Sequence, residues 1–132
     1  MDVLIVEDDP LLLSLWSTVF GEAGHNTVLA STAAEARRSL MMSKFDLMLV
    51  DLHLGSDSGL SVTTAAAYSN PDCRMIIVTG SSMFPHGELF QLAPTVSAVL
   101  RKPVMIDDLL AISEYDGADA AEEEPAPLAA CG

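Results

Sequence analysis

The sequence predicts an α/β fold, a doubly wound, five-stranded parallel sheet of the flavodoxin-like type with helices on both faces. Short apolar runs without polar alternation recur along the chain, which is typical of strands buried on both faces. Segments with helical spacing of apolar residues separate these runs. Half of the 132 residues are hydrophobic and only 5% are aromatic, so we expect one domain with an aliphatic core.

The first expected strand, 3–6, is an apolar run that leads directly into acidic residues. A helix then begins at Pro10, because Asp9 is a good N-cap and proline suits the first helical position. Gly24 is a plausible end for this helix.

The second strand covers 27–30, and the spacing of Thr32 and Glu35 predicts a capping box at the start of the next helix. The third strand, 46–50, is an unbroken apolar run that ends on Asp51. The glycines and serines that follow it predict a mobile loop.

The second half of the chain repeats this alternation. A helix over 60–68, a strand over 75–78, a strand over 96–100 and a helix over 106–113 are expected. The segment 82–94 is ambiguous, because apolar spacing suggests a short helix while a glycine weakens it.

The composition changes near residue 117 to a run rich in alanine, glutamate and proline. We expect a folded domain over 1–116 and a disordered acidic tail over 117–132. The strand order cannot be read directly, but the order 2-1-3-4-5 is the one we expect. It puts the switch point, where ligands bind in such sheets, between the first and third strands.

The net charge of −13 disfavours direct DNA binding, because it repels a phosphate backbone and no basic stripe compensates. No apolar run approaches the roughly 20 residues of a membrane helix, and Asp2 stands where an export signal would carry positive charge. Cys73 and Cys131 form no disulfide or zinc pattern. We therefore expect a cytoplasmic protein with no membrane insertion, a monomer or weak dimer.

Polar residues follow four of the expected strands: Glu7 and Asp8, Asp51, Thr79, and Lys102. Because the carboxyl ends of parallel strands share one edge, these side chains are expected to gather there. Crowded carboxylates favour a hard divalent cation, and oxygen-only ligands favour Mg²⁺.

An aspartate can act as a nucleophile toward phosphoryl groups. Transfer to Asp51 would place charge on three phosphoryl oxygens, which a cation, the Lys102 ammonium and a hydroxyl with a backbone N–H could cover. Thr79 supplies the hydroxyl, and the amides of Gly80 or His53 supply the N–H.

This arrangement resembles the receiver domain of two-component response regulators. The resemblance covers residues 1 to about 116, and the order and spacing of its four short motifs together are specific. The motifs are Leu4-Ile5-Val6-Glu7-Asp8-Asp9-Pro10, Asp46-Leu47-Met48-Leu49-Val50-Asp51-Leu52-His53-Leu54, Val78-Thr79-Gly80 and Arg101-Lys102-Pro103.

By this resemblance, Asp51 accepts phosphate from a phosphohistidine on a histidine kinase or histidine phosphotransfer protein. Asp8 would bind Mg²⁺ directly, Glu7 largely through water, and His53 through its backbone carbonyl. Thr79 and Lys102 would contact the phosphoryl group. The family also has a cis peptide bond before the proline that follows the lysine.

Two positions depart from the family pattern. Val99 stands where the family usually has an aromatic switch residue, and Gly80 stands where alanine is usual. A valine cannot swing between buried and exposed positions as an aromatic ring can. We therefore predict that output runs through backbone rearrangement of 80–95.

The sequence leaves the pathway role open. The leading prediction is a single-domain, non-enzymatic signalling protein with no separate output enzyme domain, which alters its contacts with an unknown protein target when phosphorylated. A phosphorelay intermediate, a phosphate sink, a domain cut from a longer protein and a phosphorylation-independent interaction domain are the alternatives. A haloacid dehalogenase-type phosphatase needs a second acid where His53 stands, and a flavodoxin needs a neutral phosphate loop where Glu7 begins an acidic one.

Overall fold

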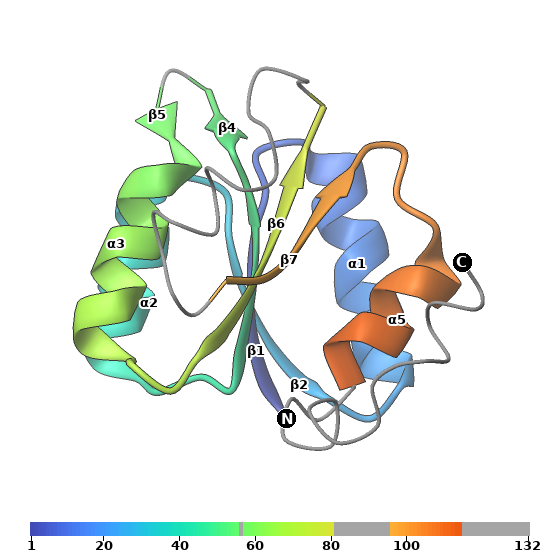
Figure 1. Cartoon of the computed structure of the whole chain (residues 1–132), viewed down its shortest axis with the longest axis horizontal. Coiled ribbons are helices and arrows are strands. Elements are labelled where there is room, and N and C mark those ends of the chain that lie inside the picture. Colours follow the sequence, from blue (N-terminus) through green and yellow to red (C-terminus); the bar gives the residue numbers. More distant parts are fainter. Residues whose placement is uncertain (56, 81–95, 115–132) are drawn as a thin grey trace.

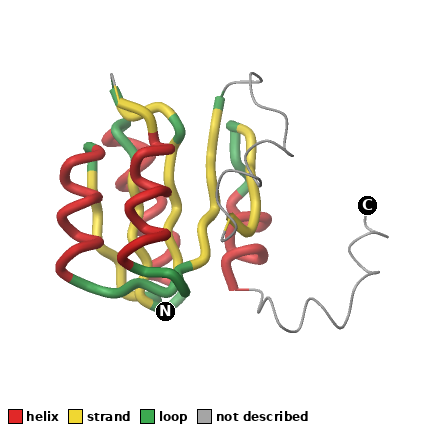
Figure 2. Tube along the Cα trace, turned by 60° about the vertical axis from the view of Figure 1, so that its left-hand side comes forward, coloured by secondary structure: helices red, strands yellow, loops and turns green. Residues whose placement is uncertain are grey.

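The computed structural model describes residues 1–55, 57–80 and 96–114. Their main feature is a five-stranded parallel sheet with the order β2-β1-β3-β6-β7, which confirms the predicted order 2-1-3-4-5. Helices lie on both sides of the sheet (Figures 1 and 2). The sheet strands are β1 (Asp2–Val6), β2 (Asn26–Ala30), β3 (Leu47–Asp51), β6 (Arg74–Thr79) and β7 (Val96–Arg101).

Four helices connect or follow these strands within the described ranges. The side chains on alternate positions of the strands belong to two separate apolar clusters, as the two-residue period of a strand requires. One cluster joins the sheet to α2 and α3, and the other joins it to α1 and α5. The helices are α1 (Pro10–Glu22), α2 (Ala33–Met42), α3 (Gly59–Ser69) and α5 (Ile106–Glu114).

The helix starts follow the expected local chemistry. The Asp9 side chain accepts a hydrogen bond from the N–H of Leu11 at 2.9 Å, so it caps α1. Thr32 caps α2 by accepting from the N–H of Glu35 at 3.1 Å. Glu35 reaches one residue further back than a standard capping box, to the N–H of Ser31 at 2.8 Å.

The stretch predicted as a mobile loop after β3 instead contains a two-stranded antiparallel ribbon, β4 (His53–Leu54) and β5 (Asp57–Ser58). The side chain of Leu54, in β4, is buried in the cluster of α2 and α3 and so anchors the ribbon to it. α3 begins directly after β5, with Ser58 as its N-cap.

Asn70 links three elements at the opposite edge of the sheet, where the amino ends of its strands lie. Its buried side chain accepts a hydrogen bond from the N–H of Phe45 at 2.8 Å and donates one to the carbonyl of Leu40 at 3.1 Å. It thereby joins the end of α2 to the start of β3 and the end of α3.

No helix within residues 1–55, 57–80 and 96–114 is long and apolar enough to cross a membrane. The ambiguous segment 82–94 and the acidic tail 117–132 lie outside the described residues, so those predictions stay predictions.

Candidate functional site

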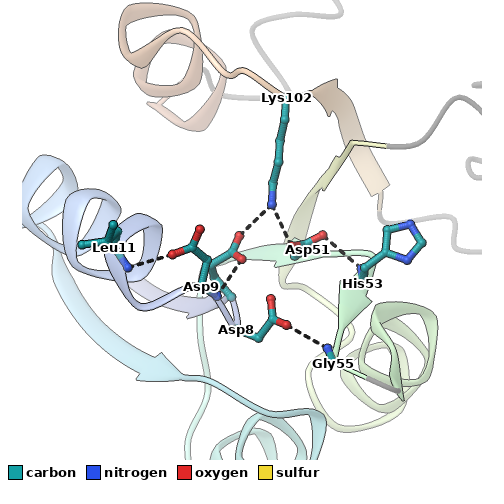
Figure 3. A network of polar contacts seen from close by, with 8 residues as sticks. Asp8, Asp9, Leu11, Asp51, His53, Gly55 and Lys102 are labelled. Carbon is teal, nitrogen blue, oxygen red and sulfur yellow. Dashed lines mark hydrogen bonds and ion pairs between the residues drawn. The ribbon is translucent and has the colours of Figure 1, made fainter.

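The acidic residues predicted to meet at the carboxyl edge of the sheet do so. Glu7 and Asp8 follow β1, and Asp51 is the last residue of the neighbouring strand β3. One carboxylate oxygen from each of the three lies within 4.8 Å of the others. Lys102, which follows β7, reaches the same place (Figure 3).

Glu7 is the most deeply buried member of this group, with none of its surface exposed. Its Oε2 accepts a hydrogen bond from the N–H of Asp9 at 3.0 Å. Its Oε1 lies 3.3 Å from the Lys102 ammonium and, among the described residues, has no hydrogen-bond partner. Burial raises the pKa of Glu7 from 4.5 to about 7, and the nearby charge of Asp51 acts in the same direction.

Lys102 bridges two of the carboxylates. Its Nζ lies 2.9 Å from Asp51 Oδ2 and 3.3 Å from Glu7 Oε1. Partial burial works to lower the pKa of Lys102, but the hydrogen bond and charge of Asp51, with the charge of Glu7, outweigh it and raise that pKa. The backbone N–H of Lys102 donates to the carbonyl of Thr79 at 2.9 Å, and the Lys102–Pro103 bond is cis, as the resemblance implied.

Asp51 is almost fully buried, with 3% of its surface exposed. Its Oδ1 accepts a hydrogen bond from the backbone N–H of His53 at 3.0 Å, so one of the two predicted amide donors already faces this carboxylate. The His53 side chain itself is exposed. The predicted role of the His53 carbonyl as a metal ligand stays a prediction.

Two glycines position this site and carried no such signal in the sequence. A Cβ on Gly59 would lie 2.1 Å from the carbonyl oxygen of Asp51, so only glycine allows α3 to start against β3. The N–H of Gly55 donates to Asp8 Oδ2 at 2.9 Å. Both glycines belong to a Gly/Ser-rich stretch whose composition indicates a loop, and composition alone does not tell which backbone N–H meets which carboxylate.

Thr79 and Gly80 end β6 at the same edge. Thr79 is buried, with 2% of its surface exposed, and Gly80 is exposed. Val99 is partly buried and packs against the α2 and α3 cluster. Most of the predicted output segment, 80–95, lies outside the described residues.

The residues at this edge fit a hard divalent cation. The candidate ligands are all carboxylate oxygens, which Mg²⁺ prefers. Among the described residues, the Lys102 ammonium contacts two of the three carboxylates, so negative charge is in excess. The buried Glu7 Oε1, which accepts no hydrogen bond from the described residues, is a group that a cation or a cation-bound water would satisfy.

Residues 3–114 match the family model described as the response regulator receiver domain. The chain is 31% identical over 125 residues to the transcriptional regulatory protein GlrR of Escherichia coli K12, covering 95% of this chain and 27% of GlrR. It is 34% identical over 80 residues to the alginate biosynthesis transcriptional regulatory protein AlgB of Pseudomonas putida, covering 61% of this chain and 18% of AlgB.

Solved structures agree on the fold. A CheY-like response regulator receiver domain protein from Methanospirillum hungatei superimposes with a TM-score of 0.76 at 29% identity, covering 83% of this chain and 87% of that one. Response regulator protein TrrA from Thermotoga maritima, solved in complex with Mg(2+)-BeF, superimposes with a TM-score of 0.72 at 22% identity, covering 83% of this chain and 93% of that one. At 22% identity, this second likeness supports the fold alone.

The relatives correct one prediction from the sequence. We expected a non-enzymatic protein that acts without a separate output domain. That expectation, which was inferred from chain length, is wrong. The matched region is only 18% of AlgB and 27% of GlrR, which are both much longer regulatory proteins. A receiver of this size is thus found within longer regulatory proteins, and its length carries no information about output.

Proposed function

Since this chain belongs to the response regulator receiver domain family, we propose that it accepts a phosphoryl group on the carboxylate of Asp51 in the presence of Mg²⁺. Receiver domains interact with histidine kinases or phosphotransfer proteins, so the proposed donor is a phosphohistidine on such a partner. The observation that carries the proposal is the Lys102 ammonium held 2.9 Å from Asp51 Oδ2 and 3.3 Å from Glu7 Oε1.

The proposed reaction moves one phosphoryl group between two nucleophiles. A carboxylate oxygen of Asp51 forms the new P–O bond while the P–N bond of the phosphohistidine breaks, and the leaving imidazole takes up a proton from solvent. Negative charge then spreads over the phosphoryl oxygens. Lys102 would move from the carboxylate to one of these oxygens, and the Thr79 hydroxyl would donate to another.

The N–H of His53, at 3.0 Å from Asp51 Oδ1, keeps the acceptor carboxylate in one orientation before transfer. Glu7, Asp8 and Asp51 would hold Mg²⁺, which neutralises charge on the transferring group. Glu7 has to be ionised for this role, although burial favours its protonated form.

A groove beside Lys102 offers a place for the donor protein. It has a volume of about 530 Å³ and is lined by α1 residues Leu12, Leu15 and Trp16 together with Pro103 and Val104. Leu11, 80% exposed, also belongs to the first turns of α1. An exposed apolar surface next to the acceptor carboxylate suits a helical partner whose phosphohistidine must approach Asp51.

The test is the intact mass of the protein after incubation with acetyl phosphate and Mg²⁺. We expect a gain of one phosphoryl group in wild type, no gain without Mg²⁺, and no gain in Asp51→Asn. Asp46→Asn, at the residue just before β3 begins, is the matched control and should gain the group normally. If wild type gains no mass from acetyl phosphate or from a phosphorylated histidine protein, the proposal is refuted.

The pathway role remains part of the proposal. A target that binds only the phosphorylated protein would assign a signalling role through protein contacts. Rapid reversible transfer to a second histidine protein would instead assign a relay or sink. The cytoplasm is the proposed location, and the net charge of −13 favours protein partners over direct contact with DNA.

A further inference from the structure

Strand β4 and the residue that follows it, Gly55, contact both sides of the acidic cluster through their backbone. The N–H of His53 donates to Asp51 Oδ1 at 3.0 Å, and the N–H of Gly55, two residues later, donates to Asp8 Oδ2 at 2.9 Å (Figure 3). One short stretch of chain therefore binds one oxygen from each of two carboxylates, Asp51 at the end of β3 and Asp8 in the segment that follows β1.

The two carboxylates differ in how much they depend on this contact. Asp51 is buried and also bound by Lys102. Asp8 is exposed, and among the described residues the Gly55 N–H is the one group found to donate a hydrogen bond to its side chain. Without that bond, the Asp8 side chain would be free to rotate into solvent, and a cation would have to restrict it on binding.

The conformation of Gly55 is what directs this N–H. Its φ is +63°, in the left-handed region that glycine adopts without steric cost. On either side of it, Leu54 pairs with Asp57 across the ribbon, and Leu54 is buried. The ribbon thus holds residue 55 in place, and glycine supplies the backbone angle that the contact with Asp8 needs.

We propose that Gly55 is a positioning residue for the cation site: its N–H orients the Asp8 carboxylate toward Glu7 and Asp51. The inference rests on the proposed function, because it takes Asp8 as a cation ligand. Carboxylates that bind metals are themselves commonly hydrogen-bonded, and losing such a partner lowers metal affinity by about 10- to 100-fold. The bond to Oδ2 leaves Asp8 Oδ1 available for the ion.

The first test measures Mg²⁺ binding by calorimetry in the full chain without any phosphodonor. Gly55→Pro removes the N–H and also forces φ to about −65°, away from the +63° of Gly55, whereas Gly55→Asn keeps the N–H with the side chain that best tolerates a positive φ. We expect affinity about 10-fold weaker in Gly55→Pro and within about 3-fold of wild type in Gly55→Asn. Wild-type affinity in Gly55→Pro, or an equal loss in both variants, would overturn the proposal.

The second test needs no cation. In the metal-free protein, Asp8→Ala should shift the Gly55 amide proton upfield and speed its exchange with solvent, because the bond to Oδ2 is lost. The His53 amide, bound to Asp51, should stay unchanged, and Asp46→Ala serves as the control. An unmoved Gly55 resonance in Asp8→Ala would refute the contact itself. Neither test involves phosphorylation, so a failure of Asp51 to accept phosphate would leave both results interpretable.

Discussion

Replacing Glu7 with glutamine should change how the stability of the metal-free protein depends on pH. The Glu7 side chain is fully buried, and this burial is the main reason that its pKa rises from 4.5 to about 7. A raised pKa means that the native state holds this proton more tightly than the unfolded state does. The contribution of Glu7 protonation to the stability of the native state is therefore complete below about pH 4.5 and is lost as the pH rises through about 7.

The size of the effect follows from the two pKa values. Each pH unit between 4.5 and about 7 corresponds to about 1.4 kcal/mol, so the loss reaches about 3 kcal/mol once Glu7 is ionised in both states. Glutamine has nearly the same shape and does not titrate. The stability of Glu7→Gln minus that of wild type should therefore increase by about 2–3 kcal/mol from about pH 5 to about pH 8.

The assay is urea unfolding followed by circular dichroism, with EDTA present, at several pH values over that range. Glu35→Gln is the control, because the N–H of Ser31 lowers the pKa of the exposed Glu35. The stabilisation from Glu35 is present above pH 4.5 and is lost only in acid, so this variant should show a flat difference from about pH 6 to about pH 8. A flat difference for Glu7→Gln as well would refute the reasoning.

Three further substitutions test the framework around the site. Gly59→Ala should destabilise the protein by about 2–4 kcal/mol in urea unfolding, because the new Cβ would lie 2.1 Å from the carbonyl oxygen of Asp51. Its control, Gly21→Ala, has nothing within 4 Å of the new Cβ and should be neutral or slightly stabilising. Equal effects of the two substitutions would contradict the close approach at Gly59. Asn70→Ala should lower the free energy of unfolding by about 2–4 kcal/mol, because it leaves buried backbone groups of Phe45 and Leu40 unpaired. Asn26→Ala removes one exposed side-chain contact and should lower the free energy of unfolding by less than about 1 kcal/mol. Similar losses in the two variants would contradict the linking role of Asn70. Lys102→Gln should slow phosphorylation by acetyl phosphate about 100-fold in a timed mass assay, and a rate within twofold of wild type would remove the lysine from the proposed mechanism.

Much of the fold was predictable because its signals are local. Uninterrupted apolar runs mark strands buried on both faces, and Asp9 and Thr32 mark helix starts through side-chain capping. The edge where the acidic residues meet was also predictable, since parallel strands bring their carboxyl ends together whatever their lengths. Glu7, Asp51 and Lys102 therefore converge as the sequence indicated.

The ribbon after β3 was missed for a physical reason. Glycine and serine favour turns of many kinds, so their presence does not say whether a segment is mobile or paired. What orders this segment is the burial of Leu54 and the contact of Gly59 with the Asp51 carbonyl, and both depend on α3 packing against the sheet.

The sequence by itself determined the alternation of strands and helices, the residues that end each strand, and hence the identity of the groups at one edge of the sheet. Only the tertiary structure decided that Glu7 is buried without a full set of partners, that Lys102 spans two carboxylates, and that the Gly55 N–H meets Asp8. The reason is that strand ends follow from local pattern, whereas burial, charge pairing and backbone contacts depend on which distant segments pack together.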